Sequence, residues 1–378
     1  MGDGPAPRIA LFASHLRTGG AEAVLVNLAA GLRARGAEFE VVLVAADGAM
    51  QARLPPGARV VILGGRTATA IPHLARYLTC SRPAALISFL EHANVAAIIA
   101  RRLAPSWRGR LVVTEHAQFA AHSRRAVSVG HRASLLLAPY AYRDADILVG
   151  VSQGMADEWR RRLAGSRVRC VAIHNPVVDD GFPGRAAAAA PHPWFAEGDP
   201  PLVAVGRLSP EKDHTTLIAA MAKPELARLR LVIIGDGPER AALERQVCAS
   251  GQSDRIAFTG MLADPLPAMA RAALLVHTSR YEGFGNVLVE ALACGTPVVA
   301  TDCPFGPAEI LAGGRHGVLV PCGEPDSLTR GIVTALAQPF DRAALRARAQ
   351  DFHLHTVAGR YLDALGLATC MNRSQTGA

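Results

Sequence analysis

Residues 274–301 read LLVHTSRYEGFGNVLVEALACGTPVVAT, and this stretch decides the fold class of the chain. A short apolar run at 274–278 leads into a turn with two glycines, and a second apolar run follows at 297–301. Between them, residues 285–293 place apolar side chains at helical spacing. Continuous apolar strands that are joined through a helix are typical of parallel sheets, which are buried on both faces. The stretch therefore predicts a βαβ unit of an α/β protein.

The same alternation of apolar strands and amphipathic helices runs outward through the rest of the chain. Seven strands are predicted in the first half, at 8–12, 40–45, 60–63, 85–89, 111–114, 147–151 and 169–174. Six are predicted in the second half, at 202–206, 230–235, 256–259, 274–278, 297–301 and 317–320. A stretch rich in proline and alanine, residues 181–201, interrupts the alternation. We therefore predict two Rossmann-like domains, each a doubly wound parallel sheet.

The interruption sets the predicted domain limits, and a length of 378 residues also favours two domains. The first domain is expected at residues 1–185, the linker at 186–200 and the second domain at 201–350. A last helical pattern, with Val357, Tyr361 and Leu365 on one face, falls in a terminal segment at 351–378.

Cysteine spacing and hydropathy exclude several protein classes. The seven cysteines stand singly without C-x-x-C spacing, so neither a disulfide framework nor a zinc site is indicated. The first residues are few and polar, and we expect no signal peptide. No apolar run reaches the ~20 residues that a membrane helix needs. We therefore expect a cytoplasmic protein, peripheral on the cytoplasmic face of the inner membrane.

Positive charge is concentrated in the first half of the chain. Residues 1–190 hold 23 arginines, no lysine and 13 acidic residues, whereas residues 191–378 hold 17 basic and 19 acidic residues. This asymmetry favours an anionic partner for the first half: lipid headgroups, a lipid diphosphate or nucleic acid. Arginines on solvated faces would give the same count. Aromatic residues are few and are not interleaved with the arginines, which argues against nucleic acid.

Two acids and a glycine turn make the opening stretch a candidate ligand site. Glu282 and Glu290 bracket Gly283 and Gly285, and Asn286 is the predicted N-cap of the following helix. The free backbone N–H groups of a helix start bind phosphate. Carboxylates repel phosphate, so the two acids should accept hydrogen bonds from hydroxyl groups instead. A phosphate seat beside two hydroxyl acceptors is what a nucleotide-sugar site requires.

A second candidate loop follows the strand predicted at 202–206. It carries Arg207 and Lys212, five residues apart. Arginine offers bidentate contacts and lysine a point charge, so the two together are suited to clamp a diphosphate. Ligands of open parallel sheets bind at the carboxyl ends of the strands, where both candidate loops should lie. The alternative is a solvated loop whose two cations have no ligand.

Three other motifs are candidates for a ligand or metal site. The pair Gly19-Gly20 lies between the first strand and the first helix and tolerates phosphate, although it is not the G-x-G-x-x-G dinucleotide fingerprint. His116 follows the fifth predicted strand, where it is either a site residue or a structural histidine. Asp144 and Asp146 have the D-x-D spacing of a metal–nucleotide site. They precede their strand, which places them at the opposite sheet edge, so we predict no metal there.

Together these motifs resemble those of glycosyltransferase family 4, whose members are retaining enzymes of GT-B fold. The resemblance covers nearly the whole chain and is strongest over 203–320. It rests on Gly206-Arg207-Leu208…Lys212, on Ile234-Gly235-Asp236-Gly237-Pro238 and on Glu282-x7-Glu290 with the following Ala-Leu-Ala-Cys-Gly-Thr-Pro. Gly19-Gly20, Glu115-His116 and Val149-Gly-Val-Ser152 fit the same family. The resemblance implies two Rossmann-like domains facing a cleft, with the donor in the second and the acceptor in the first. It also implies that the helix in the terminal segment at 351–378 packs back on the first domain.

The resemblance also implies roles for the matching residues. Arg207 and Lys212 would hold the donor diphosphate, and Glu290 would accept from the ribose hydroxyls. Glu282 and His116 would contact the transferred sugar, His116 near the reaction centre. We therefore expect these to be catalytic: His116, Glu282, Arg207 and Lys212. We expect the remaining donor contacts from Gly19, Gly20, Phe284, Gly285, Asn286 and Val287.

The reaction that the resemblance implies is transfer with retention of the anomeric configuration. No well-placed enzymic nucleophile is evident, so we expect front-face transfer in which the leaving phosphate accepts the acceptor's proton. Cations and helix-start N–H groups would stabilise that phosphate, so neither a metal nor a cofactor is expected. The segment 301–310 resembles members that build bacterial lipid-linked or surface glycans. We expect a hexose or N-acetylhexosamine to move from a UDP-sugar to a polyprenyl-diphosphate or polysaccharide acceptor at an anionic membrane surface.

Two other functions are compatible with these motifs. A GT-B transferase that acts on a small polar acceptor would need no membrane, and a nucleotide-sugar-binding protein would need no catalysis. The sequence has no readable code for the donor base, the sugar, the linkage or the acceptor.

Overall fold

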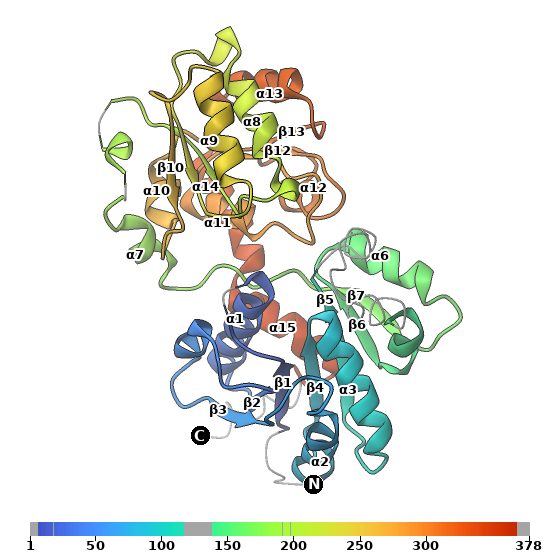
Figure 1. Ribbon diagram of the computed structural model, residues 1–378. Coiled ribbons are helices and arrows are strands. Elements are labelled where there is room, and N and C mark those ends of the chain that lie inside the picture. Colours follow the sequence, from blue (N-terminus) through green and yellow to red (C-terminus); the bar gives the residue numbers. More distant parts are fainter. Residues whose placement is uncertain (1–6, 18, 117–137, 191, 197, 369–378) are drawn as a thin grey trace. The chain divides into compact units, whose positions relative to one another are not determined.

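The structure, a computed structural model, describes residues 7–17, 19–116, 138–190, 192–196 and 198–368. The chain divides into two compact units, which are described separately (Figure 1). The first unit runs to Val177 and resumes at His353, and the second unit is Val178–Phe352. Each unit contains one parallel sheet.

The first unit holds a seven-stranded parallel sheet in the order β3-β2-β1-β4-β5-β6-β7. Its strands are β1 (Ile9–Ala13), β2 (Phe39–Leu43), β3 (Arg59–Ile62), β4 (Ala85–Phe89), β5 (Arg110–Glu115), β6 (Ile147–Gly150) and β7 (Arg169–Ala172). Every residue of β1, β2 and β4 is buried, which explains why these strands are almost continuously apolar. The strand order reverses between β1 and β4, and ligands of such sheets bind at the carboxyl edge near that point.

The helix at Leu354–Leu365, near the end of the described chain, belongs to this first unit. The helices of the unit include α1 (Gly20–Ala34), α2 (Ile71–Ser81), α3 (Glu91–Leu103), α6 (Gln153–Arg162) and α15 (Leu354–Leu365). Helix α15 packs against α1 (Figure 1), and its Val357 and Tyr361 share a core cluster with Leu28 of α1. Gly31 permits this close approach, because a Cβ there would lie 2.4 Å from the carbonyl oxygen of Leu354.

The second unit holds a six-stranded parallel sheet in the order β10-β9-β8-β11-β12-β13. Its strands are β8 (Leu202–Val205), β9 (Leu231–Ile234), β10 (Ile256–Gly260), β11 (Leu274–His277), β12 (Val298–Thr301) and β13 (Val318–Val320). Its helices include α7 (Phe182–Ala187), α8 (His214–Met221), α9 (Arg240–Ala249), α10 (Leu266–Arg271), α11 (Asn286–Cys294), α12 (Pro307–Ile310), α13 (Pro325–Ala337) and α14 (Arg342–Ala349). Strands β8 and β11 are neighbours where the order reverses, so their carboxyl ends meet at the switch point.

The predicted fold class, two parallel-sheet α/β domains, is confirmed, and all thirteen predicted strands are present. The unit boundary, however, lies between Val177 and Val178, before the predicted domain end at residue 185. Residues 186–200, predicted as a linker, belong to the second unit. The physical reason is that α7 packs on α10, where Arg271 donates to the carbonyl oxygens of Ala186 and Ala187 at 3.4 and 3.2 Å.

The helices of both units are short. Helix α1, with 15 residues, is the longest in the described part of the chain. Over that same part, no helix combines the length and the apolar character needed to cross a membrane.

Candidate active site

Two loops at the carboxyl edge of the second sheet are tied together. One follows β8 and the other follows β11. Thr278 Oγ1 donates to the carbonyl oxygen of Lys212 at 2.8 Å, and the Arg280 N–H donates to that of Glu211 at 2.8 Å. The Arg280 guanidinium also pairs with Asp213 at 3.0 Å. The structure therefore brings together the two loops that the sequence singled out.

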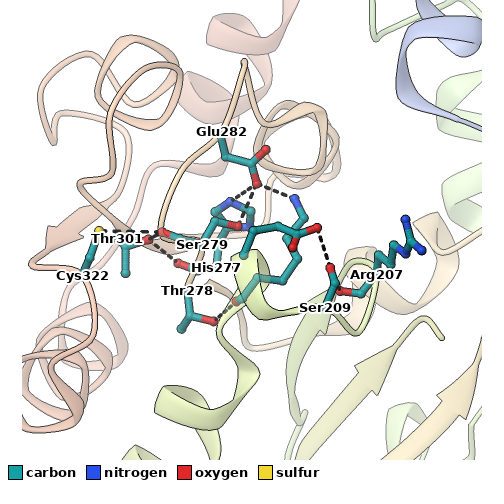
Figure 2. A network of polar contacts seen from close by, with 10 residues as sticks. Arg207, Ser209, His277, Thr278, Ser279, Glu282, Thr301 and Cys322 are labelled. Atoms are coloured by element: carbon teal, nitrogen blue, oxygen red, sulfur yellow. Dashed lines mark hydrogen bonds and ion pairs between the residues drawn. The ribbon is translucent and has the colours of Figure 1, made fainter. Parts of the chain in front are cut away.

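Glu282 is the centre of what we call the charged cluster: Lys212, His277, Ser279 and Glu282 (Figure 2). Its Oε1 is ion-paired with Lys212 Nζ and accepts a hydrogen bond from Ser279 Oγ at 2.8 Å. His277 Nε2 lies 3.0 Å from the same oxygen, as a close contact without the alignment of a hydrogen bond. Three side chains thus converge on one carboxylate oxygen.

The charged cluster keeps Glu282 ionised. Burial by itself would raise the pKa of Glu282, but the positive charge of Lys212 and the neighbouring His277 outweigh it and hold that pKa well below its ordinary value. The side chains of Glu282, Lys212 and His277 are only 12%, 22% and 4% exposed. Among the described side chains none contacts Glu282 Oε2 at hydrogen-bond distance, so this second oxygen is available to a hydroxyl group.

Arg207 lies apart from the charged cluster. Its side chain is exposed, and Figure 2 shows it extending away from Glu282. The backbone is anchored, because the Ser209 N–H donates to the Arg207 carbonyl oxygen at 2.9 Å and the Leu208 N–H donates to that of Asp236 at 3.0 Å. The loop therefore fixes the Arg207 backbone and leaves its guanidinium toward solvent.

Helix α11 begins at the glycine turn and presents its amino end at the same sheet edge. Gly285 is the N-cap and Asn286 the first helical residue, so the prediction that Asn286 caps the helix was wrong. The reason is the backbone of Gly285, whose φ of 100° is costly for any residue with a Cβ. Phe284 anchors the turn by packing on Phe352, with ring centroids 5.5 Å apart. Glu290 is partly exposed, one helical turn further along.

In the first unit, His116 follows β5 and is held by its neighbours. Its Nε2 lies 2.9 Å from Thr114 Oγ1, and its ring stacks on Phe89 with centroids 5.8 Å apart. Burial lowers the pKa of His116 to about 4, so the ring is neutral at physiological pH. Its Nδ1 is buried and has no hydrogen-bond partner in the described parts of the chain.

Glu115, the neighbour of His116, is buried and uncharged at neutral pH. Its Oε1 accepts hydrogen bonds from Tyr142 Oη and, at 3.2 Å, from Asn94 Nδ2. Burial raises the pKa of Glu115 to about 8, and the nearby charge of Glu91 also raises it. The carboxyl group therefore holds a proton at pH 7.

Gly19 and Gly20 lie at the start of α1. Gly19 is the N-cap in an extended conformation, and a Cβ added to Gly20 would meet no atom within 4 Å. The space at Gly20 is therefore open, as a ligand approach requires, whereas a Cβ at Gly19 would lie 2.3 Å from Glu22 Oε2. Glu22 occupies the first turn of α1, 3.5 Å from His15 Nδ1, and its charge weakens this helix start as a phosphate seat.

Asp144 and Asp146 are engaged at the amino edge of the first sheet. Arg101 pairs with Asp146 and Arg102 with Asp144, each at 2.6 Å, and the Leu111 N–H donates to Asp146 at 2.7 Å. Both carboxylates thus have structural partners. Over the described residues, no group of three or more His, Cys, Asp or Glu is arranged to hold a metal ion.

A cavity of about 440 Å³ also lies at the amino edge of the first sheet, where Arg8, Arg59 and Glu40 line it. Glu40 is completely buried and accepts from Tyr77 Oη at 2.5 Å and from Arg8 at 3.3 Å. The strands start at this edge, so the cavity is remote from His116, which follows the end of β5. We interpret it as the surface of a structural ion-pair cluster.

Sequence reasoning missed His277 and Ser279 as members of the charged cluster. The available signal was the end of the apolar strand at 274–278, where His277, Thr278 and Ser279 are polar and lie at a carboxyl edge. It also missed Thr114, because a threonine inside a buried strand is ordinary in composition.

Two family models match the chain. Residues 191–352 match the model of the glycosyl transferases group 1, and residues 18–180 match that of Glycosyltransferase Family 4. Each model falls largely on one of the two units.

Curated relatives are similar over part of their length. The N-acetylgalactosamine-N,N'-diacetylbacillosaminyl-diphospho-undecaprenol 4-alpha-N-acetylgalactosaminyltransferase of Campylobacter jejuni is 28% identical over 209 residues, covering 55% of this chain and 56% of that protein. The lipopolysaccharide core biosynthesis glycosyltransferase LpsE of Rhizobium meliloti is 29% identical over 235 residues, covering 59% and 65%. The chain thus spans less than two thirds of the length of these relatives.

Solved structures share the fold. HepE of Anabaena, in complex with UDP, has a TM-score of 0.75 at 24% identity, covering 95% of this chain and 99% of that chain. The lipopolysaccharide outer core galactosyltransferase WaaB has a TM-score of 0.72 at 18% identity, with the same coverage. With both family models matched in chain order and two parallel-sheet units of GT-B type, the chain belongs to the group 1, family 4 glycosyltransferases.

Proposed function

We propose that this protein is a retaining glycosyltransferase that moves a hexose or N-acetylhexosamine from a UDP-sugar to a lipid-linked or polysaccharide acceptor. The observation that carries the proposal is the convergence of Lys212 and Glu282 at the switch point of the second sheet. A sugar diphosphate needs a cation for its phosphates and an acceptor for its hydroxyls, and these two residues offer both. The solved complex of HepE with UDP supports the choice of base.

Donor binding exchanges partners within the charged cluster. The diphosphate takes Lys212 as its counter-ion, joined by Arg207 and by the N–H groups at the start of α11, from Gly285 to Val287. Glu282 then offers its oxygens to the sugar hydroxyls, and Glu290 accepts from the ribose. Ser279 and His277 stay in contact with Glu282 and keep its carboxylate in place.

The proposed reaction is a front-face substitution at the anomeric carbon. The bond from C1 to the diphosphate oxygen breaks, and the bond from the acceptor oxygen to C1 forms on the same face. The acceptor's proton passes to an oxygen of the leaving phosphate. Negative charge grows on the diphosphate, and Lys212 and Arg207 stabilise it; one such donor contributes about 3–4 kcal/mol in other enzymes. With these cations in place the scheme requires no metal.

The first unit contributes to the same proposal through its family resemblance. We assign His116 to the transferred sugar and Gly19 and Gly20 to the approach of the diphosphate. The empty space at Gly20 and the unpartnered Nδ1 of His116 in the described structure support these assignments.

Thermal unfolding with a panel of nucleotide sugars and free nucleotides tests donor binding. We expect a UDP-sugar to raise the melting temperature of the wild type and to raise that of Lys212→Ala much less. A larger shift with GDP-mannose would overturn the choice of UDP. GDP-mannose belongs in the panel because some of the relatives are GDP-mannose-dependent mannosyltransferases.

Transfer to the acceptor needs its own test. We expect product with a polyprenyl-diphosphate glycan and binding to anionic liposomes that salt weakens, because the first half is arginine-rich. A second candidate function is transfer to a small polar acceptor, which two relatives from Streptomyces kanamyceticus favour, a 2-deoxystreptamine glucosyltransferase and an alpha-D-kanosaminyltransferase. Turnover with such acceptors and no liposome binding would select it. Donor binding without transfer or hydrolysis would select a binding protein.

A further inference from the structure

The hydrogen bonds around His116 determine which ring nitrogen carries the proton. Thr114 Oγ1 donates its single proton to the carbonyl oxygen of Ser88 at 2.8 Å, and a carbonyl oxygen only accepts. His116 Nε2 lies 2.9 Å from the same hydroxyl oxygen. Because the hydroxyl proton is already used, Thr114 accepts from His116, and Nε2 carries the ring proton.

The surroundings hold this arrangement in place. Thr114 and Ser88 are completely buried on the adjacent strands β5 and β4, so water does not compete for their hydrogen bonds. Asn94 Nδ2 donates to the Thr114 carbonyl oxygen at 2.9 Å, which fixes the strand end. Phe89, the register partner of Thr114, stacks on the imidazole with an interplanar angle of 24°.

A neutral ring with its proton on Nε2 has a lone pair on Nδ1. That nitrogen is the buried atom for which the described residues provide no hydrogen-bond partner. We infer that Thr114 is a positioning residue whose hydroxyl holds His116 as the Nε2–H tautomer, so that Nδ1 accepts a hydrogen bond from a hydroxyl group of the sugar substrate. The assignment of that hydroxyl to a sugar rests on the proposed function, whereas the tautomer does not.

The tautomer gives the site a selectivity. A lone pair on Nδ1 attracts hydroxyl groups, which donate, and repels the oxygens of a diphosphate, which accept. With the opposite tautomer the ring would offer an N–H and would attract phosphate. By fixing this tautomer, Thr114 makes His116 bind hydroxyl groups and leaves the binding of phosphate to Lys212.

Nitrogen-15 NMR of protein labelled in its histidine rings tests the tautomer directly. The chain has 13 histidines, so the His116 signals are assigned as those missing from His116→Asn. We expect a protonated Nε2 and an unprotonated Nδ1, unchanged in Thr114→Ser, which keeps the hydroxyl. Thr114→Val keeps the shape and should give a mixture of tautomers; unchanged thermal unfolding and circular dichroism serve to show that it folds. A proton on Nδ1 in the wild type, or an unaltered tautomer in Thr114→Val, would overturn the inference.

Turnover with donor analogues tests what Nδ1 accepts. Once the panel has identified a donor, each sugar hydroxyl is replaced by hydrogen or by fluorine. At one position both analogues should have a kcat/KM about tenfold lower than the parent donor. This is the loss expected for one hydrogen bond, because neither hydrogen nor fluorine can donate one to Nδ1. Thr114→Val should lose a similar factor with the parent donor, and Thr114→Ser should recover it. A fluoro donor as good as the parent, at the position where the deoxy donor loses activity, would overturn the acceptor role of Nδ1. Absence of all transfer with the expected NMR result would instead contradict the proposed function.

Discussion

The charged cluster of the second unit and the surroundings of His116 in the first unit both hold buried polar side chains in place. The first does so through paired charges, and the second through hydrogen bonds between uncharged groups. Both lie at the carboxyl edge of a parallel sheet. In the charged cluster Lys212 and Glu282 form an ion pair, and the charge of Lys212 helps to hold the pKa of Glu282 below its ordinary value. Beside His116 the groups are uncharged, because burial lowers the pKa of His116 to about 4 and raises that of Glu115 to about 8. We call His116, Thr114, Glu115, Tyr142 and Asn94 the neutral cluster.

The difference shows how each cluster responds to a ligand. An ion pair exchanges one partner for another, so a diphosphate competes with Glu282 for Lys212. A hydrogen-bonded neutral network does not exchange partners, because each buried polar group would lose its bond. It adds a ligand only at an atom that is still free, and in the described neutral cluster Nδ1 of His116 and Oδ1 of Asn94 are buried without a hydrogen-bond partner.

The largest effect is expected for Lys212→Ala. This change removes the cation that compensates Glu282 and, by our proposal, the diphosphate charge, so turnover should fall by about 10²–10³-fold. The chain has one other lysine, Lys223, which forms a surface ion pair with Asp326. Lys223→Ala is the matched control and should transfer at the wild-type rate. Equal rates for the two variants in a steady-state assay would remove Lys212 from the mechanism.

The two clusters should respond to pH with opposite sign. The pKa of Glu115 rises from 4.5 to about 8 in the folded state, so the native protein binds the extra proton between these values. Its stability should therefore fall as the pH rises through this window, by up to about 1.4 kcal/mol per pH unit. Glu115→Gln keeps an acceptor at Oε1 and should abolish this dependence in urea unfolding at pH 5, 6.5 and 8. A slope equal to that of the wild type would show that Glu115 is ionised in the native state.

Glu282 provides the contrast in the same experiment. Its pKa is held below the ordinary value of 4.5, so the stability from its ion pair is fully present above about pH 4.5 and is lost as the pH falls further. Glu282→Gln should therefore change the slope only in acid, outside the window in which Glu115→Gln acts.

The contrast also explains what the sequence could predict. Lys212 and Glu282 lie in the loops that follow strongly apolar strands, and a parallel sheet brings the carboxyl ends of neighbouring strands to one edge, so the sequence predicts their convergence. The ion pair between Lys212 and Glu282 is not predictable from the sequence. It depends on which of several nearby acceptors Lys212 reaches when no donor is bound. The residue type of Asn286 predicts a helix cap, whereas the left-handed backbone of Gly285 makes Gly285 the N-cap. Thr114 gave no signal, since its role rests on where one hydroxyl proton goes.

A smaller effect is expected for Ser279→Ala. Ser279 supplies one of the three contacts to Glu282 Oε1, and hydrogen bonds to a charged acceptor contribute about 1.5–3 kcal/mol. Lys212 and His277 remain, so we expect KM for the donor to rise by about tenfold while kcat changes less. Ser209→Ala, which loses a hydrogen bond to Glu211 outside the charged cluster, is the control. If the two variants have the same KM, Ser279 does not orient Glu282.

The smallest effect is expected from chelation. In the proposed scheme the cations that balance the leaving diphosphate belong to the protein, so transfer should proceed at the same rate in EDTA and in added Mg²⁺ or Mn²⁺. Asp146 would be a poor metal ligand, because Arg101 and the Leu111 N–H already occupy its carboxylate. If EDTA abolishes transfer and Mn²⁺ restores it, the charged cluster is insufficient alone. Asp146→Asn then tests whether the D-x-D pair binds the metal. If the variant still depends on metal, the ion binds elsewhere. If the variant no longer responds to metal, Asp146 is a ligand and Arg101 must release it.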